Sequence, residues 1–139
     1  MKITICGSLQ FATEMKKIQK ELENKGHQIL MPQSVIEGQS KEYSRSLKEK
    51  DLAQFTEFIG GRIKLHTSKI GRSDAILVLN YDKDGKRNYI GPNTFLEMGF
   101  AFVTGKKIFT INPISNDDKH DELISMDPCC INNNLELIK

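Results

Sequence analysis

The spacing of apolar residues changes several times along the chain, and each change marks the boundary of a predicted element. Residues 2–6, KITIC, form a short β-rich run that ends at Gly7-Ser8. From residue 11 to residue 25 the apolar side chains recur every three or four positions, which is the period of a helix. The chain therefore opens with a strand, a turn and a helix that closes on Gly26.

A second strand and a longer helix are predicted next. Residues 28–31, QILM, have the pattern of a short strand and end at Pro32. The stretch from residue 33 to residue 50 is polar. A helical stripe then runs from about residue 51 to residue 72. Its members are Leu52, Phe55, Ile59, Ile63, His66 and Ile70.

Two further strands follow the long helix. Residues 75–79, AILVL, are a continuous apolar run, as expected for a central parallel strand that is buried on both faces. Residues 81–91 are polar and contain glycine, so we predict a loop there. Residues 107–111 form another strand. The tail from residue 121 has the pattern of a short helix and a last strand near Ile131.

Strands that alternate with helices form right-handed crossovers and a parallel sheet. We therefore predict the α/β class, with a doubly wound, flavodoxin-like or Rossmann-like parallel sheet of about five strands and helices on both faces. At 139 residues the chain forms one domain over residues 1–139. Ligands of such sheets bind beyond the carboxyl ends of the strands, where the strand order reverses. These ends are Gly7-Ser8, Asn80-Tyr81 and Asn112-Pro113.

Residues 93–105, NTFLEMGFAFVTG, have the pattern of a short helix that is apolar on nearly every side. A helix of this kind is normally buried. Its one charged residue is Glu97, and an ionised carboxylate is rarely buried without a partner. Two interpretations remain open: Glu97 is a functional acid at a ligand site, or it is a partly solvated helix acid that the helix dipole stabilises.

The turn before this helix is a candidate anion site, because backbone N–H groups at a helix start attract negative charge. Gly91, Asn93 and Thr94 are therefore candidate substrate-binding residues, and Gly7-Ser8 lies near the same edge of the sheet. Together with Glu97 they can hold a phosphate or sugar hydroxyls beside an acid. The structural alternatives are that Gly7 only makes a turn and that Asn93 or Thr94 caps the helix.

The charge pattern excludes some classes of partner. The formal net charge of +2 comes from 20 basic and 18 acidic residues that are scattered along the chain, whereas a nucleic-acid binder needs a clustered basic face. The apolar start, MKITICGSLQ, is too short for a signal peptide, and no segment approaches the ~20 apolar residues that span a bilayer. We predict a cytoplasmic protein with no nucleic-acid and no membrane partner.

Cysteine and histidine residues do not indicate a metal site. The three cysteines are odd in number, and Cys129-Cys130 lack CxxC spacing, so free thiols fit better than disulfides or zinc. The three histidines lie far apart, and HExxH, Walker A and GxGxxG motifs are missing. We predict no metal and no cofactor. On this pattern alone His66 is a satisfied, semi-buried histidine of the helical stripe.

Three segments resemble a known family. They are ICGS at residues 5–8, SDAILVLNYD at residues 73–82 and GPNTFLEMGFAFVTGKKIF at residues 91–109. All three are similar to the nucleoside 2-deoxyribosyltransferase family and its nucleotide N-glycosidase relatives, and they look most like an uncharacterised prokaryotic branch. The similarity extends from Lys2 to about Pro113.

The resemblance implies roles for the matching residues. In the family, the glutamate at the position of Glu97 is the nucleophile, which attacks the anomeric carbon and forms a glycosyl-enzyme intermediate. In the family, the turn at the position of Gly91 to Thr94 binds the sugar, or its 5′-phosphate in the phosphate-accepting members, and the resemblance implies that Gly7 and Ser8 line the same pocket. The family assembles as homodimers or larger homo-oligomers, and the same is expected here.

The sequence departs from the family at two places. Members carry an aspartate that handles the proton on the base, eight positions before the aspartate that matches Asp74; this position is His66 here. Many members also have a tyrosine where this chain has Ile5-Cys6. With an ordinary pKa of about 6.5, His66 is the candidate proton donor to the leaving base near neutral pH.

We therefore predict hydrolysis or transfer at the N-glycosidic bond of a nucleoside or a nucleoside 5′-monophosphate. The turn at the helix start favours the monophosphate, because a dianion suits unpaired N–H groups better than a neutral hydroxymethyl group does. The alternative is a non-catalytic nucleotide-binding or sensing module of the same fold. A third interpretation is an interaction scaffold that binds no small molecule.

Overall fold

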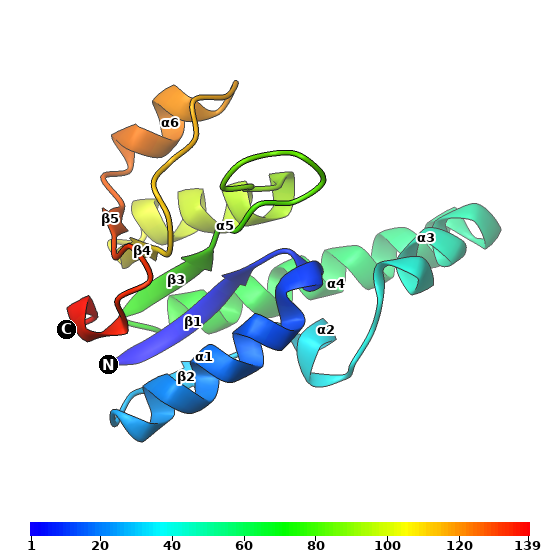
Figure 1. Ribbon diagram of the computed structural model, residues 1–139. Helices are drawn as coiled ribbons and strands as arrows, with labels where there is room; N and C mark the ends of the chain where they lie inside the picture. Colours follow the sequence, from blue (N-terminus) through cyan, green and yellow to red (C-terminus); the bar gives the residue numbers. More distant parts are fainter.

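Five parallel strands form the centre of the structure, a computed structural model that describes all of residues 1–139. The strands are β1 (Lys2–Gly7), β2 (Gln28–Leu30), β3 (Ala75–Leu79), β4 (Lys107–Thr110) and β5 (Cys129–Cys130). Their order is β2-β1-β3-β4-β5, and every neighbouring pair is parallel (Figure 1). This confirms the predicted doubly wound α/β sheet, and the order is the flavodoxin-like one.

The predicted helices are present, and the structure adds two more. The expected ones are α1 (Ala12–Asn24), α4 (Leu52–Gly71), α5 (Pro92–Val103) and α6 (His120–Ser125). Two short 3₁₀ turns that were not predicted are η1 (Leu9–Phe11) and η2 (Leu135–Leu137). The additional ones, α2 (Gln33–Ile36) and α3 (Lys41–Lys50), lie in the polar stretch. No residue of α3 is buried, so its sequence carries no core-facing stripe. No helix combines the length with the low polarity that crossing a bilayer requires.

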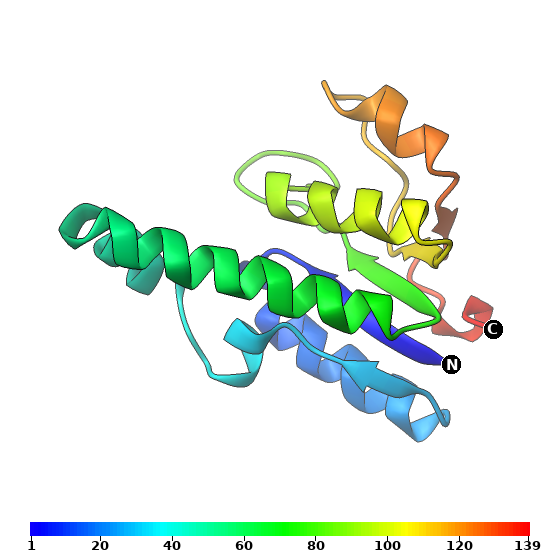
Figure 2. The ribbon, with the colours of Figure 1, turned by 180° about the vertical axis from the view of Figure 1, so that it is seen from behind.

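The strands direct alternate side chains into two cores. On β1, Ile3 and Ile5 face the core that α1 and the C-terminal segment cover, whereas Cys6 faces the opposite core. Helices α4, α5 and α6 cover this second core, and Figure 2 shows α4 and α5 in front of the sheet. The alternation of side chains along β1 therefore determines that Cys6 faces the core covered by α4, α5 and α6.

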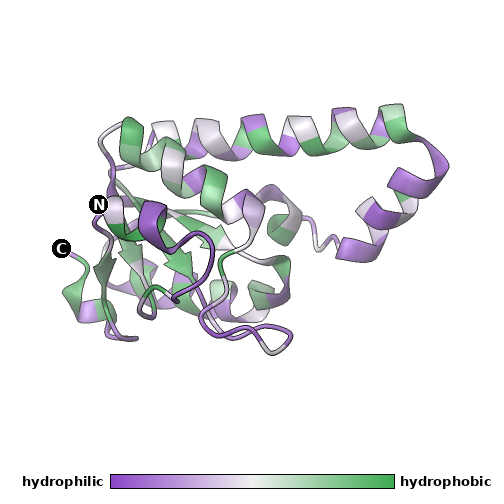
Figure 3. Ribbon diagram, turned by 90° about the horizontal axis from the view of Figure 1, so that it is seen from above, coloured by the Kyte–Doolittle hydropathy of each residue, from purple (hydrophilic) through white to green (hydrophobic).

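Helix α4 reaches beyond the sheet, and its first half packs against α3 (Figure 3). In this contact the rings of Tyr43 and Phe58 meet edge to face, with centroids 5.3 Å apart. The apolar stripe of α4 enters the core only at its C-terminal end. Leu52 is 61% exposed, and His66 and Ile70 are the buried members of the stripe.

Helix α5 buries one face and exposes another. The buried residues recur at helical spacing and are Thr94, Glu97, Met98 and Ala101. Glu97 therefore lies on the stripe that faces the core. Exposed apolar side chains are Leu96, Phe102 and Val103. The burial that is normal for a helix apolar on nearly every side therefore holds for one face of α5 only, and other apolar side chains of the helix are exposed.

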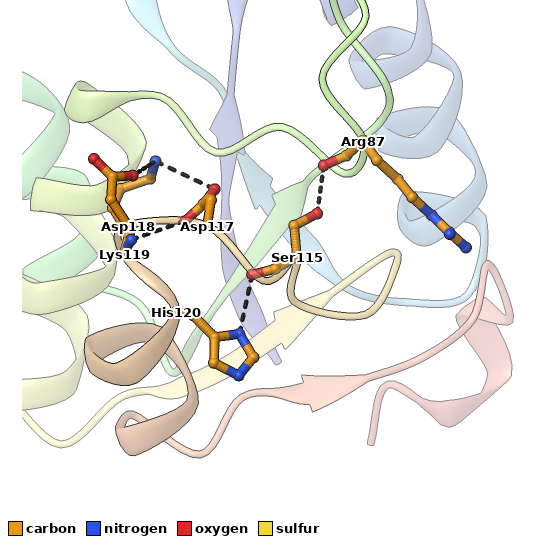
Figure 4. A network of polar contacts seen from close by, with 6 residues as sticks. All are labelled: Arg87, Ser115, Asp117, Asp118, Lys119 and His120. Carbon is orange, nitrogen blue, oxygen red and sulfur yellow. Dashed lines mark hydrogen bonds and ion pairs between the residues drawn. The ribbon is translucent and has the colours of Figure 1, made fainter.

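Paired asparagines join the carboxyl ends of β3 and β4. Asn80 Nδ2 donates to the Asn112 carbonyl at 2.8 Å, and Asn80 Oδ1 accepts from the Asn112 N–H at 2.9 Å. The Ser115 hydroxyl donates to the Arg87 carbonyl (Figure 4). This bond links the loop that follows β4 to the loop that follows β3. These bonds hold residues 80–91 in place at the edge of the sheet where the candidate site lies.

Candidate active site

A cavity of about 290 Å³ opens at the carboxyl ends of β1 and β3, where the strand order reverses. Ligands of doubly wound sheets bind at this position. The turn after β1, the loop after β3, helix α4 and the start of α5 all contribute to its lining. Every residue that the sequence analysis assigned to the site lines this one cavity: Gly7, Ser8, His66, Gly91, Asn93, Thr94 and Glu97.

Two of these residues are glycines for steric reasons. Gly7 has a φ of 152°, and a Cβ there would lie 3.1 Å from the Leu79 carbonyl oxygen. The turn that Gly7 makes brings Ser8 to the cavity. At Gly91 a Cβ would lie 2.8 Å from the Tyr89 hydroxyl, so the missing side chain lets the Tyr89 ring lie against the start of α5.

The start of α5 leaves backbone donors available. Pro92 lies in the first turn of the helix, where its missing N–H has no helical partner to lose. No side chain caps the helix, so the alternative that Asn93 or Thr94 is the cap is wrong. Both side chains line the cavity instead, beside the first N–H groups of α5.

Glu97 lies in the cavity beside His66 and Cys6, and each of the three comes from a different element. Glu97 is only 7% exposed, which excludes the partly solvated helix acid. His66 Nε2 lies 3.6 Å from Glu97 Oε2 and 3.6 Å from Cys6 Sγ. Glu97 Oε2 and His66 Nδ1 are buried without a hydrogen-bond partner, whereas His66 Nε2 contacts the Cys6 thiol and the Ile5 backbone acts to raise the pKa of the ring. A structural role for His66 stays an alternative prediction.

Burial sets the protonation of this cluster. It raises the pKa of Glu97 to about 7, and a contact from the Cys6 thiol offsets part of the rise. Burial, and to a smaller extent the Lys69 ammonium, lower the pKa of His66 to about 4. Burial and then the Glu97 charge raise the pKa of Cys6 well above its ordinary value. Near neutral pH, Cys6 and His66 are neutral and Glu97 is about half ionised.

Glu97 and His66 together hold one proton between about pH 4 and about pH 7, and in the free protein it rests on Glu97. Moving this proton to His66 costs about 4 kcal/mol, given the difference between the two pKa values. The ion pair formed by the transfer, with atoms 3.6 Å apart, regains roughly as much at an effective dielectric constant of about 20. Both arrangements of the proton are therefore accessible.

Cys6, His66 and Glu97 also offer the donor types of a metal site, with ligand atoms within 4.8 Å of one another. Zinc accepts thiolate, imidazole and carboxylate ligands. A metal-bound histidine usually donates its other ring N–H to an acceptor, yet His66 Nδ1 has no partner. The raised pKa of Cys6 also opposes thiolate formation. The absence of a metal stays a prediction.

Cys6, which contacts His66 behind the cavity wall, and three residues that line the cavity escaped the sequence analysis. Cys6 could have been placed beside the α4–α5 layer by the alternation along β1. Arg62 lines the same cavity and precedes His66 by one helical turn, so helical spacing could have found it. Lys41 and Lys83 also line the cavity. No pattern signals them, because one lies on a helix without buried residues and the other in a loop.

Comparisons with known proteins support the fold. No protein-family model matches the chain, and no curated protein matches it. Among solved structures, the chain is similar to a 2-deoxyribosyltransferase from the psychrotolerant bacterium Bacillus psychrosaccharolyticus, with a TM-score of 0.51 and 16% sequence identity. The match covers 93% of this chain and 82% of that one. At this identity the likeness shows a shared fold, the one that the sequence resemblance implies.

We expect Glu97→Gln to change how stability depends on pH. A carboxyl group whose pKa rises from 4.5 to about 7 on folding stabilises the fold while protonated, and this contribution is lost as the pH rises through about 7. The amide cannot ionise, so the variant should gain about 3 kcal/mol over the wild type between acidic pH and about pH 8. Urea unfolding across this range measures the difference.

The matched control for this experiment is Glu57→Gln on the exposed side of α4. Its stability relative to the wild type should not vary with pH in the same window. If the Glu97→Gln difference is equally flat, Glu97 ionises as freely in the folded protein as in the unfolded one, and the buried acid is refuted.

Proposed function

We propose that the protein cleaves or transfers the N-glycosidic bond of a nucleoside or a nucleoside 5′-monophosphate. One observation carries this proposal: the buried carboxyl group of Glu97 lines a cavity, has an unpartnered oxygen, and lies 3.6 Å from His66. A purely structural acid would be solvated or paired with a cation. The 2-deoxyribosyltransferase of similar fold supports the same bond as the target.

The proposed reaction consists of two displacements at one carbon. Glu97 attacks the anomeric carbon, the bond to the base breaks, and its electron pair stays on the base nitrogen, which takes up a proton. Water, or the N–H of a second base, then attacks the same carbon and gives its proton to His66. The bond to Glu97 breaks with its electron pair on the carboxylate, which releases the sugar or the transfer product. Each step inverts the carbon, so the product retains its configuration.

His66 is the proposed proton donor to the base, although alone it is neutral at pH 7. The expectation that it titrates near its ordinary pKa is wrong, because burial lowers this pKa to about 4. The proton comes from the pair: its move from Glu97 to His66 creates the nucleophile and the acid together. The pair is competent only while it holds one proton, between about pH 4 and about pH 7.

A nucleotide-binding module without turnover is the second candidate. It is supported by Cys6, which lies where many family members have a tyrosine and which contributes a neutral thiol to the cluster. The two candidates share the cavity and differ only in the fate of the glycosidic bond. Base release therefore decides between them.

The proposal includes assembly with a second copy of the chain. Helix α5 carries Leu96 and Val103 seven positions apart, which places them on one side of the helix. Leu96 is 61% exposed and Val103 is 77% exposed. These two exposed side chains, together with the homo-oligomers that the sequence resemblance implies, support a contact between copies through this side of α5.

Glu97→Gln should abolish base release while the fold is retained. The amide preserves the shape of the side chain but is no nucleophile, and loss of a nucleophile lowers turnover by roughly a thousandfold or more. Chromatography of free bases after incubation with a panel of nucleosides and 5′-monophosphates measures this. Glu57→Gln is the control and should match the wild type.

Base release that survives in Glu97→Gln would contradict the nucleophile assignment. Ligand binding by the wild type with no base release from any member of the panel would favour the binding module instead.

The pH dependence of turnover should invert in His66→Asn. In the wild type we expect turnover to fall as the pH rises through about 7, because the pair loses its proton. Without His66, the remaining activity should be lower by roughly a hundredfold or more, and it should rise with pH as Glu97 ionises. Initial rates between pH 4 and pH 9, measured with both proteins, show whether turnover falls with pH in the wild type and rises with pH in the variant. Profiles of the same shape would remove His66 from the reaction.

Leu96→Glu and Val103→Glu should weaken self-association, because each buries a charge in the proposed contact between copies. Sedimentation velocity over a concentration series measures this, and Leu137→Glu at an exposed C-terminal position is the control. A wild type that is monomeric at all concentrations would contradict the assembly.

A further inference from the structure

Lys83 is a buried lysine in the cavity wall that the proposed chemistry does not use. It belongs to the loop after β3, lines the cavity and is 7% exposed. Its Nζ donates to Ser8 Oγ at 3.0 Å and lies 4.8 Å from the centroid of the Tyr89 ring. Two backbone hydrogen bonds of 2.9 Å between Lys83 and Lys86 fix the loop at this point. The ammonium group is therefore held at the cavity.

No carboxylate forms an ion pair with this ammonium, and the charge of the neighbouring Asp84 acts on it only from beyond ion-pair distance. The ion pairs of the chain involve other residues, and no acidic oxygen lies within 4.0 Å of Lys83 Nζ. Burial, and then the neighbouring Lys41, lower the pKa of Lys83 to about 8. Burying the Lys83 ammonium beside the Lys41 ammonium lowers the stability of the ligand-free protein. An anion bound between the two ammonium groups would neutralise their charges and raise the stability.

The other groups at the cavity are suited to an anion as well. Arg62 is paired with Glu37, yet its Nε–H is buried without a partner. Ser8 accepts from Lys83, so its own hydroxyl proton is free to donate. The uncapped start of α5 adds backbone N–H groups. Glu97, the one acid that lines the cavity, is protonated below about pH 7.

We propose that Lys83, with Ser8 and Lys41, forms an anion-binding subsite of the cavity that holds a phosphomonoester group of the substrate. This deepens the proposed function and rests on it, since it makes the substrate a nucleoside phosphate instead of a free nucleoside. Two ammonium groups balance a phosphate dianion, and ammonium groups act as point charges that suit its tetrahedral oxygens. The turn before α5, which the sequence indicated as the anion site, supplies N–H groups but no full charge.

Binding of small phosphates tests the subsite without any turnover. Calorimetric titration compares ribose 5-phosphate and 2-deoxyribose 5-phosphate with ribose, 2-deoxyribose and inorganic phosphate. We expect the wild type to bind at least one sugar phosphate roughly tenfold or more tightly than its uncharged sugar, with weaker binding at high salt. Lys83→Met should lower that affinity by roughly tenfold to a hundredfold, while Lys83→Arg should retain most of it.

Lys86→Met is the matched control. Lys86 lies on the same turn and over the same Tyr89 ring, at 5.7 Å from its centroid, but it is exposed and does not line the cavity. Its affinities should stay within about twofold of the wild type. Thermal melting without ligand separates binding from a structural role: Lys83→Met should melt at the same temperature as the wild type or higher, because it removes an unpaired buried cation.

The proposal is overturned if no phosphate probe binds better than its sugar, or if Lys83→Met binds the phosphates as the wild type does. It is also overturned if Thr94→Ala loses phosphate binding while Lys83→Met keeps it, since the turn alone would then be the anion site. These outcomes do not depend on Glu97. Base release from free nucleosides, with no role for Lys83, would leave the proposed function standing and remove only the subsite.

Discussion

The site depends on one constraint: the fold keeps a carboxyl group out of water without giving it a cation. Glu97 lies on the core-facing stripe of α5, so it is carried inward by the same periodicity that buries Met98 and Ala101. Its neighbours there are a neutral thiol and an imidazole whose pKa burial lowers to about 4. Burial favours the uncharged form of all three groups, and the contact from the Cys6 thiol offsets only part of this effect on Glu97. The pKa of Glu97 therefore lies near neutral pH.

The rest of the architecture places this cluster. The alternation along β1 sends Cys6 toward the α4–α5 layer, and the C-terminal third of α4 brings His66 to the same place. The strand order reverses between β1 and β3, which opens the cavity beside them. The asparagine pair at the ends of β3 and β4 holds the loop that carries Lys83. A buried acid and a buried unpaired cation thus line one cavity, and a ligand with a phosphate and a glycosidic bond would use both.

Much of the fold is predictable from the sequence because the spacing of apolar residues indicates which side of each helix or strand is buried. The run at residues 75–79 is β3 to the residue, and the stripes at residues 11–25 and 51–72 are α1 and α4. Helix α3 could not be found in this way, since it packs on the exposed half of α4 and buries no residue. The apolar pattern of α5 does not tell which of its faces is buried, because Leu96, Phe102 and Val103 are exposed although they are apolar.

The candidate site is predictable only where residues lie at the ends of strands or the starts of helices. Glu97 and the turn before it stand out in the sequence, and all the assigned residues line one cavity. The contact between Cys6 and His66 could not be predicted, because it joins residues from β1 and α4 across the core. The low pKa of His66 has the same origin: it follows from tertiary burial, which no local pattern of the sequence contains.

The ionisation of Glu97 tests the central claim most directly. Carbon-13 NMR of the side-chain carboxyl, assigned by its loss in Glu97→Gln, follows this one group as the pH is varied. The buried arrangement beside His66 and Cys6 predicts a titration centred near pH 7. A midpoint near 4.5, the value of an ordinary glutamate, would show that Glu97 is solvated or paired, and would contradict both the poised acid and the reaction built on it.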